Sequence, residues 1–60
     1  MKVYINDQEI DLIPGMTVEH ALINARLIDR IKEGDKVYDE MENEIGLGGA
    51  LKEGAKIYVR

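Results

Sequence analysis

Residues 2–13 read KVYINDQEIDLI, two stretches of alternating polar and apolar residues separated by the polar run Asn6-Asp7-Gln8. Alternation with a period of two is typical of a strand with one face buried. We therefore predict a β-hairpin with a connection of three or four residues. Val3 and Ile5 face inward in this interpretation, and Pro14-Gly15 ends the hairpin.

A helix is predicted directly after this hairpin. Thr17 is a suitable N-cap, and His20 stands at the third helical position, where a capping box usually has glutamate. The apolar positions that share one helical sector are Val18, Ala21, Leu22, Ala25 and Ile28. Leu27 does not fit that sector, so we expect the helix to end near Ala25 or Arg26 and Leu27 to turn back into the core.

Short strands are predicted for the rest of the chain. Residues 36–39 form a third strand with Val37 inward, and residues 42–44 form a polar tip. Ile45 and Leu47 indicate a short fourth strand. Residues 56–60, KIYVR, alternate cleanly and predict a terminal strand with Ile57 and Val59 inward.

The predicted order β-β-α-β-β-β places residues 1–60 in one α+β domain. If the last strand pairs beside the first, the product is a β-grasp, with a mixed four- to five-stranded sheet and one helix packed across one face. A simple antiparallel meander with a helix laid on it is the alternative.

Composition narrows the class of protein. A chain of 60 residues buries only about 60% of its unfolded surface. Cysteine is absent, so an aliphatic core rather than disulfides must hold the fold. The net charge of −4 argues against a nucleic-acid partner. With neither a leader pattern nor an apolar run of about 18 residues, the sequence predicts a cytoplasmic protein with no membrane contact.

Several motifs resemble those of the ubiquitin-like β-grasp superfamily, and specifically the ThiS/MoaD sulfur carriers. They are the hairpin turn at residues 6–8, the Pro-Gly-x-Thr-Val segment at 14–18, and L-x-x-G-x-x-I-x-V at 51–59. The resemblance covers nearly the whole chain and implies fold more strongly than function. The start of the helix also resembles plant-type ferredoxins, and the last strand resembles SLBB modules, which bind small ligands.

The functional group of the sulfur carriers is a free Gly-Gly end, whose carboxylate is adenylated by a partner enzyme. This chain ends Tyr58-Val59-Arg60, and its Gly48-Gly49 pair is internal. A ferredoxin would need four thiolates for its cluster, and the chain has none. A sulfur-carrier relative and an SLBB-like small-ligand binder remain alternative functions.

Catalytic, cofactor and metal sites are not predicted. Serine is absent, and the one histidine, His20, lies where it and Thr17 would cap the helix. The acidic residues 39–44 do not match a calcium-loop spacing and are interpreted as a solvated hairpin tip. The glycines of residues 46–49 lack a phosphate-binding pattern and indicate a turn. We therefore expect a protein that is not an enzyme.

Strand parity provides the one candidate binding surface. If the predicted core residues face the helix, all three tyrosines must face away from it. The residues assigned to this partner site are Tyr4, Tyr38, Tyr58, Lys2, Lys56, Arg60 and Ile13. Tyrosine and arginine are enriched at binding hot spots, so an aromatic and basic face predicts an interaction module that binds a protein partner or itself. Tyrosines that only stabilise the sheet are the alternative interpretation.

Overall fold

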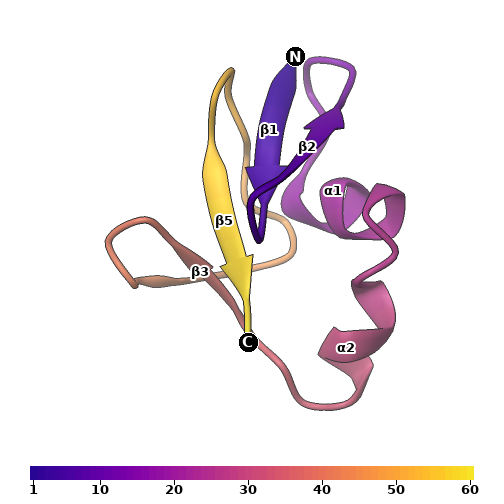
Figure 1. Ribbon diagram of the computed structural model, residues 1–60, viewed down its shortest axis with the longest axis vertical. Coiled ribbons are helices and arrows are strands. Elements are labelled where there is room, and N and C mark those ends of the chain that lie inside the picture. The colour runs from indigo at the N-terminus through magenta and orange to yellow at the C-terminus, as the bar shows by residue number, and fades with distance from the viewer.

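The computed structural model describes residues 1–60 (Figure 1). The predicted hairpin is present as β1 (Lys2–Ile5) and β2 (Gln8–Asp11), but its connection has two residues rather than three or four. Asn6 and Asp7 have φ values of 49° and 69°. Two central residues with positive φ form a type I′ turn, whose twist matches that of the strands, and Asn and Asp tolerate this conformation better than most residues.

The other strands are β3 (Val37–Asp39), β4 (Glu44–Ile45) and β5 (Lys56–Val59). They extend the hairpin into a five-stranded sheet of order β2-β1-β5-β3-β4. β5 runs parallel to β1 and antiparallel to β3. The Tyr4 N–H donates to the Ala55 carbonyl at 2.8 Å beside this parallel pair. The sheet is therefore mixed, and the alternative of a simple antiparallel meander is wrong.

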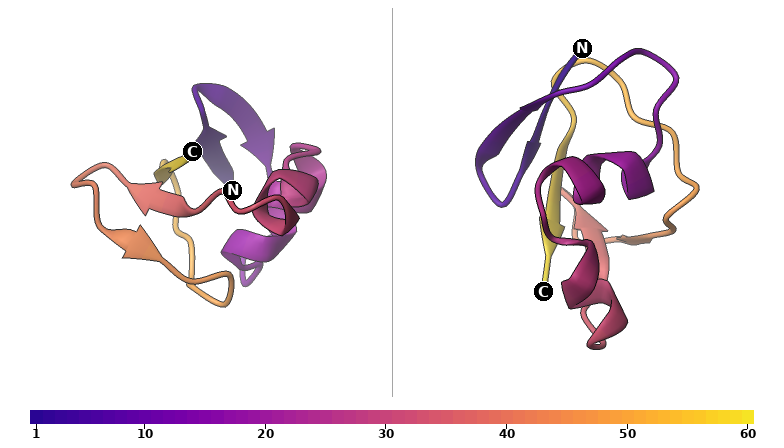
Figure 2. Two further views of the ribbon diagram at one scale, coloured as in Figure 1. Left: turned by 90° about the horizontal axis from the view of Figure 1, so that it is seen from below. Right: turned by 90° about the vertical axis from the view of Figure 1, so that its right-hand side faces the viewer.

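The core lies between this sheet and the helices, which cover one of its faces (Figure 2). β1 and β5 bury every second residue, as the alternation predicted. All five residues predicted to face inward are buried. The full core consists of Val3, Ile5, Ile10, Leu12, Val18, Ala21, Leu22, Ala25, Val37, Ile57 and Val59.

Helix α1 (Val18–Asn24) ends where the sequence predicted. Arg26, with φ 61°, adopts the left-handed conformation immediately after the C-cap. The Leu27 N–H donates to the Leu22 carbonyl and the Arg26 N–H to the Ile23 carbonyl, the two bonds of a Schellman motif. Leu27 then packs against the core, as predicted.

A second helix, α2 (Ile28–Lys32), follows at once and was not predicted, so the expectation of one helix is wrong. It has five residues, too few for a periodic pattern to be recognised in the sequence. Ile28 and Ile31, one turn apart, pack against the core. A second Schellman motif ends α2, with Gly34 at φ 112° in the left-handed position.

The fourth strand is shorter than predicted, because Leu47 lies beyond it. The Leu47 carbonyl accepts a hydrogen bond from the Glu19 N–H at 2.9 Å, and the Gly49 carbonyl accepts one from the Val18 N–H at 3.0 Å. These two donors belong to the first turn of α1 and have no partner within the helix. The Leu47 and Gly49 carbonyls therefore cap the first turn of α1.

Candidate functional site

The sheet surface turned away from the helices is the candidate site, called here the open face. Its three tyrosines, Tyr4, Tyr38 and Tyr58, are all half-buried. Tyr38 and Tyr58 are direct cross-strand neighbours, and Tyr4 lies opposite Lys56 on the parallel side of β5. The three rings alternate with the buried residues of their strands, as strand parity predicted, and the pairing of β5 with both β1 and β3 brings them onto adjacent strands.

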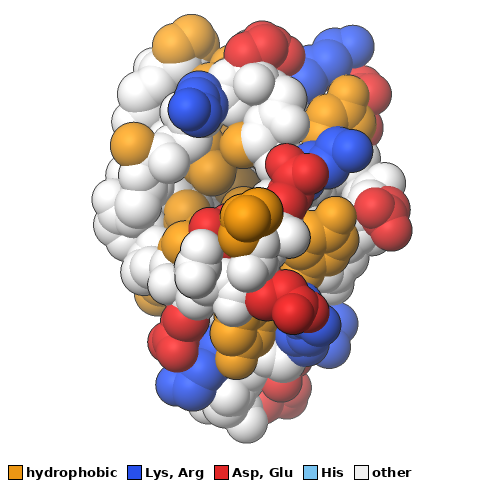
Figure 3. All heavy atoms as spheres, turned by 90° about the vertical axis from the view of Figure 1, so that its left-hand side faces the viewer, with side chains coloured by type: hydrophobic (Ala, Val, Ile, Leu, Met, Phe, Trp, Pro, Cys, Tyr) orange, Lys and Arg blue, Asp and Glu red, His pale blue; other side chains and the backbone are white.

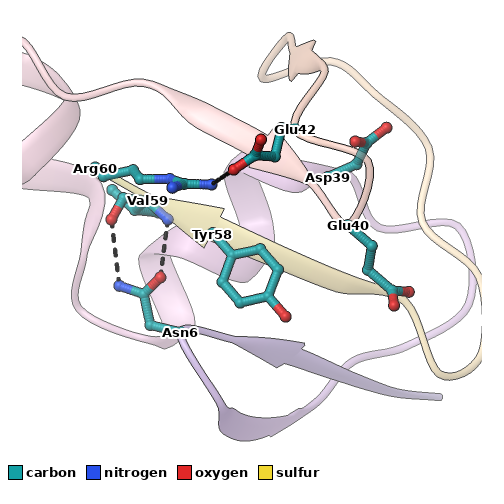
Figure 4. A pocket seen from close by; sticks show the side chains of 7 residues that line it. All are labelled: Asn6, Asp39, Glu40, Glu42, Tyr58, Val59 and Arg60. Carbon is teal, nitrogen blue, oxygen red and sulfur yellow. Dashed lines mark hydrogen bonds and ion pairs between the residues drawn. The ribbon is translucent and has the colours of Figure 1, made fainter.

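Arg60 connects this aromatic pair to the β3–β4 hairpin. Its guanidinium carbon lies 5.2 Å from the centroid of the Tyr38 ring, within cation–π range. Its Nη2 atom also lies 3.5 Å from Oε1 of Glu42 (Figure 4). The Arg60 guanidinium is therefore held in place by a cation–π contact with Tyr38 and an ion pair with Glu42.

The expectation of a basic patch is wrong, because most cations on the open face have an acidic neighbour. Besides Arg60, Lys2 pairs with Glu9 at 3.3 Å and Lys36 with Glu44 at 3.8 Å. Lys56 alone of the predicted basic residues has no ion pair. Viewed from the side opposite the helices, acidic and basic side chains are interspersed among apolar ones (Figure 3). The open face is aromatic with mixed charge.

Lys2 shows this electrostatic environment most clearly. Its hydrogen bond to Glu9, followed by the charges of Glu9 and Asp11, raises the pKa of Lys2 above its ordinary value. Any stability that this pair contributes is present below the ordinary pKa and lost as the pH rises through the folded pKa. The pair is exposed to solvent, so its contribution is small.

A shallow depression of about 390 Å³ lies beside Tyr58 (Figure 4). It is lined by Asn6, Asp39, Glu40, Glu42, Tyr58, Val59 and Arg60. The sequence interpretation included only Tyr58 and Arg60 of this set. Glu40 and Glu42 were assigned to a solvated tip, and they reach the open face because the β3–β4 hairpin folds beside the end of β5.

The Asn6 side chain supports the Tyr58 side of the depression. Its Oδ1 atom accepts from the Val59 N–H at 2.9 Å, and its Nδ2 atom donates to the Val59 carbonyl at 3.4 Å. The Asn6 side-chain amide thus forms the two hydrogen bonds to β5 that a backbone peptide group would form if β1 were one residue longer. Nothing local in the sequence signals this role, because Val59 lies 53 residues away along the chain.

The carboxylate of Asp39, the last residue of β3, is hydrogen-bonded to the tip of the β3–β4 hairpin. Its Oδ1 atom accepts hydrogen bonds from the backbone N–H groups of Met41 and Asn43, both at 2.9 Å. The bond from Asn43, with a smaller contribution from Met41, lowers the pKa of Asp39 below its ordinary value. Asp39 therefore orders the tip rather than presenting a free ligand, and no group of acidic or histidine side chains forms a metal-binding cluster.

The remaining polar motifs also have structural roles. The Thr17 N–H donates to Nδ1 of His20 at 3.0 Å, so histidine takes the place of the usual capping-box glutamate. At Gly49 a Cβ atom would approach the Gly46 carbonyl oxygen to 3.1 Å, which explains a glycine there. Two carbonyl oxygens of the Gly-rich loop, at Leu47 and Gly49, accept the N–H groups of Glu19 and Val18 in the first turn of α1, so these donors are already paired.

Ile13 lies apart from the tyrosines. It follows the end of β2 and is 68% exposed, so it sits at the rim of the open face rather than on a strand.

Neither helix has the length and apolar content needed to cross a membrane. Comparisons of the chain with models of protein families, with curated proteins and with solved structures found no match.

Proposed function

We propose that this protein is a non-catalytic β-grasp module that binds a protein partner, or a second copy of itself, through the tyrosines of its open face. The parallel pairing of β1 with β5, with both helices on one side of the sheet, supports the β-grasp assignment. The observation that carries the function is the placement of three half-buried tyrosines on adjacent strands of one uncovered sheet face.

The tyrosine rings are the side chains of the open face that would contribute most to the free energy of binding. Tyrosine provides a large apolar area, a hydroxyl group and few rotatable bonds, so binding costs little conformational entropy. The surrounding ion pairs are exposed and contribute little affinity, but their mixed signs favour a partner of complementary pattern over indiscriminate association. Tyr4 and Tyr58 should therefore dominate binding.

The two alternative functions receive less support. The Gly48-Gly49 segment caps α1 through the Gly49 carbonyl, so this internal pair cannot serve as a carrier tail in the folded protein. If an SLBB-like binder used the exposed loop of residues 46–50, the Leu47 and Gly49 carbonyls would not be free for a ligand, because both already accept hydrogen bonds from α1. No observation favours either alternative over the open face.

The experiment compares wild type with the double variant Tyr4→Ala and Tyr58→Ala. Partners are recovered by pull-down from the native host and self-association is measured by sedimentation. Hot-spot truncation costs about 2 kcal/mol or more, so we expect affinity to fall at least about 30-fold. Ile23→Ala is the matched control, because Ile23 is an exposed apolar residue on the helical side.

Circular dichroism and an amide NMR spectrum must show that the double variant folds, since cross-strand aromatic pairs also stabilise a sheet. A folded double variant that retains every partner and the wild-type association state would contradict the proposal. Equal loss in the Ile23→Ala control would assign binding to the helical side instead.

A further inference from the structure

The sheet has two edges, and they differ in how much free backbone they present. β4 has only two residues, and the carbonyl of Gly46, just beyond it, accepts a hydrogen bond from the Gly49 N–H at 3.1 Å. β2 has four residues, pairs only with β1, and contains no proline. A strand edge of this kind is a template for pairing with another chain.

The hydrogen-bond alternation identifies the free groups on β2. Met1 and Leu12 exchange two bonds, from the Leu12 N–H at 2.7 Å and from the Met1 amino group at 2.9 Å. In an antiparallel pair, every second residue points its backbone at the partner strand. The backbone groups of Gln8 and Ile10 therefore point at β1, while the backbone N–H and C=O groups of Glu9 and Asp11 point outward. These outward backbone groups take part in no turn, loop or side-chain hydrogen bond.

The side chains along this edge are acidic. Glu9 and Asp11 lie on the open face, Asp7 occupies the adjoining turn, and all three are exposed. Two cations lie near this edge: Lys2 pairs with Glu9, and the Met1 amino group donates to the carbonyl of Leu12, the residue after Asp11. A second copy of β2 paired in antiparallel fashion would place acidic side chains opposite acidic side chains, which destabilises cross-strand pairing. The edge thus disfavours self-association and favours a cationic strand.

We propose that the outer edge of β2 binds an extended peptide segment with basic side chains at alternate positions, which adds to the sheet as an antiparallel sixth strand. The backbone groups of Glu9 and Asp11 hold the segment, as in other cases of strand addition. Two lysines or arginines, two residues apart, stand opposite Glu9 and Asp11. The residue between them lies on the face of Ile10 and is apolar. The site is the backbone edge of β2, and it adjoins the tyrosines of the open face, because Glu9 is the direct cross-strand neighbour of Tyr4.

The probe is a blocked peptide of about six residues with alternating lysine and valine, matched to the usual length of a strand. Amide NMR follows its titration into the whole protein. We expect the largest shifts, and slowed hydrogen exchange, at the N–H groups of Glu9 and Asp11. Affinity should fall steeply as ionic strength rises, because the charged groups are exposed and screened. An alternating glutamate and valine peptide should not bind.

Two substitutions at one position separate the backbone from the charge. Asp11→Asn removes the carboxylate but retains the N–H, so affinity should fall by up to about fivefold. Asp11→Pro removes the outward N–H while the β1–β2 bonds remain, since proline is tolerated on the open side of an edge strand. We expect Asp11→Pro to weaken binding at least about tenfold, the equivalent of one lost hydrogen bond.

The proposal is overturned if the peptide does not bind, or if Asp11→Pro binds as tightly as Asp11→Asn. It is also overturned if concentration-dependent shifts at Glu9 and Asp11 arise without peptide, since a second copy would then occupy the edge. Binding that is lost in Tyr58→Ala but not in Asp11→Pro would place the peptide on the open face instead.

Discussion

Asp39 shows how much structure one exposed carboxylate can organise. One of its oxygens accepts two backbone N–H groups of the hairpin tip, and its own N–H donates to the Asn43 carbonyl at 3.0 Å. Glu42, in the same tip, has φ 64° and lies beside Arg60. Hydrogen bonds to the Asp39 carboxylate therefore order the hairpin tip, whose residues line one side of the depression beside Tyr58.

The pH dependence of stability should show this role. Because hydrogen bonds to the carboxylate lower the pKa of Asp39 from its ordinary value of 3.8, the folded state holds the proton less tightly than the unfolded state. The stabilisation is fully present above the ordinary pKa and is lost as the pH falls through the lower, folded pKa. We expect Asp39→Asn to be less stable than wild type near neutral pH, with the difference disappearing in acid.

Urea unfolding across an acid pH series measures this difference directly. Glu40→Gln is the control, because it removes a neighbouring exposed charge that makes no hydrogen bond. A difference between wild type and Asp39→Asn that stays constant down to the lowest pH would show that ionisation of Asp39 does not stabilise the hairpin.

At the scale of elements, the two helices end in the same motif with different residues. Gly34 occupies the left-handed position after α2, while Arg26 occupies it after α1. The left-handed conformation costs a non-glycine residue about 1 to 2 kcal/mol. Arg26 is exposed and forms neither an ion pair nor a side-chain hydrogen bond that would offset this cost.

Arg26→Gly should therefore stabilise the protein. Part of the relieved strain is offset because glycine makes the unfolded chain more flexible, so we expect a net gain of up to about 1 kcal/mol. Thermal unfolding should shift upward by about 4 to 8 °C per kcal/mol. Gly34→Arg is the mirror control and should lower the transition temperature. A loss of stability in Arg26→Gly would mean that the arginine side chain contributes more than its backbone costs.

At the scale of the whole molecule, Asn6 joins the first strand to the last. Its amide bonds to both peptide groups of Val59 extend the parallel β1–β5 pair beyond the strand end. Val59 is buried, with 3% of its surface exposed, so loss of the Asn6 amide leaves its backbone polar groups without these partners. Such groups are costly to bury unpaired.

Asn6→Gly tests this connection without disturbing the turn, since glycine also adopts the positive φ found at residue 6. We expect a loss of about 1 to 2 kcal/mol in the free energy of unfolding, from two bonds of modest net value. Asp7→Gly is the matched control, because Asp7 also has positive φ but makes no side-chain hydrogen bond. Equal effects of the two substitutions would assign the loss to glycine flexibility rather than to the Asn6 amide.

Alternation in the sequence was sufficient to predict which side chains of β1, β3 and β5 face the core, and therefore that three tyrosines share the open face. Capping residues were sufficient to locate α1, because Thr17 and His20 act within one helical turn. These features follow from local geometry, in which each residue's direction depends on its own strand or helix. The five residues of α2 fell below the length at which such periodicity can be detected.

Only the tertiary structure decided which strands are neighbours, and most properties of the open face depend on that. The pairing of β5 with both β1 and β3 sets Tyr58 beside Tyr38 and brings Asn6 to Val59. The β3–β4 hairpin carries Glu42 to Arg60, which turns a predicted basic patch into a face of mixed charge. Contacts between residues distant in sequence have no local signature, so the direction of the tyrosines was predictable from the sequence while their charged surroundings were not.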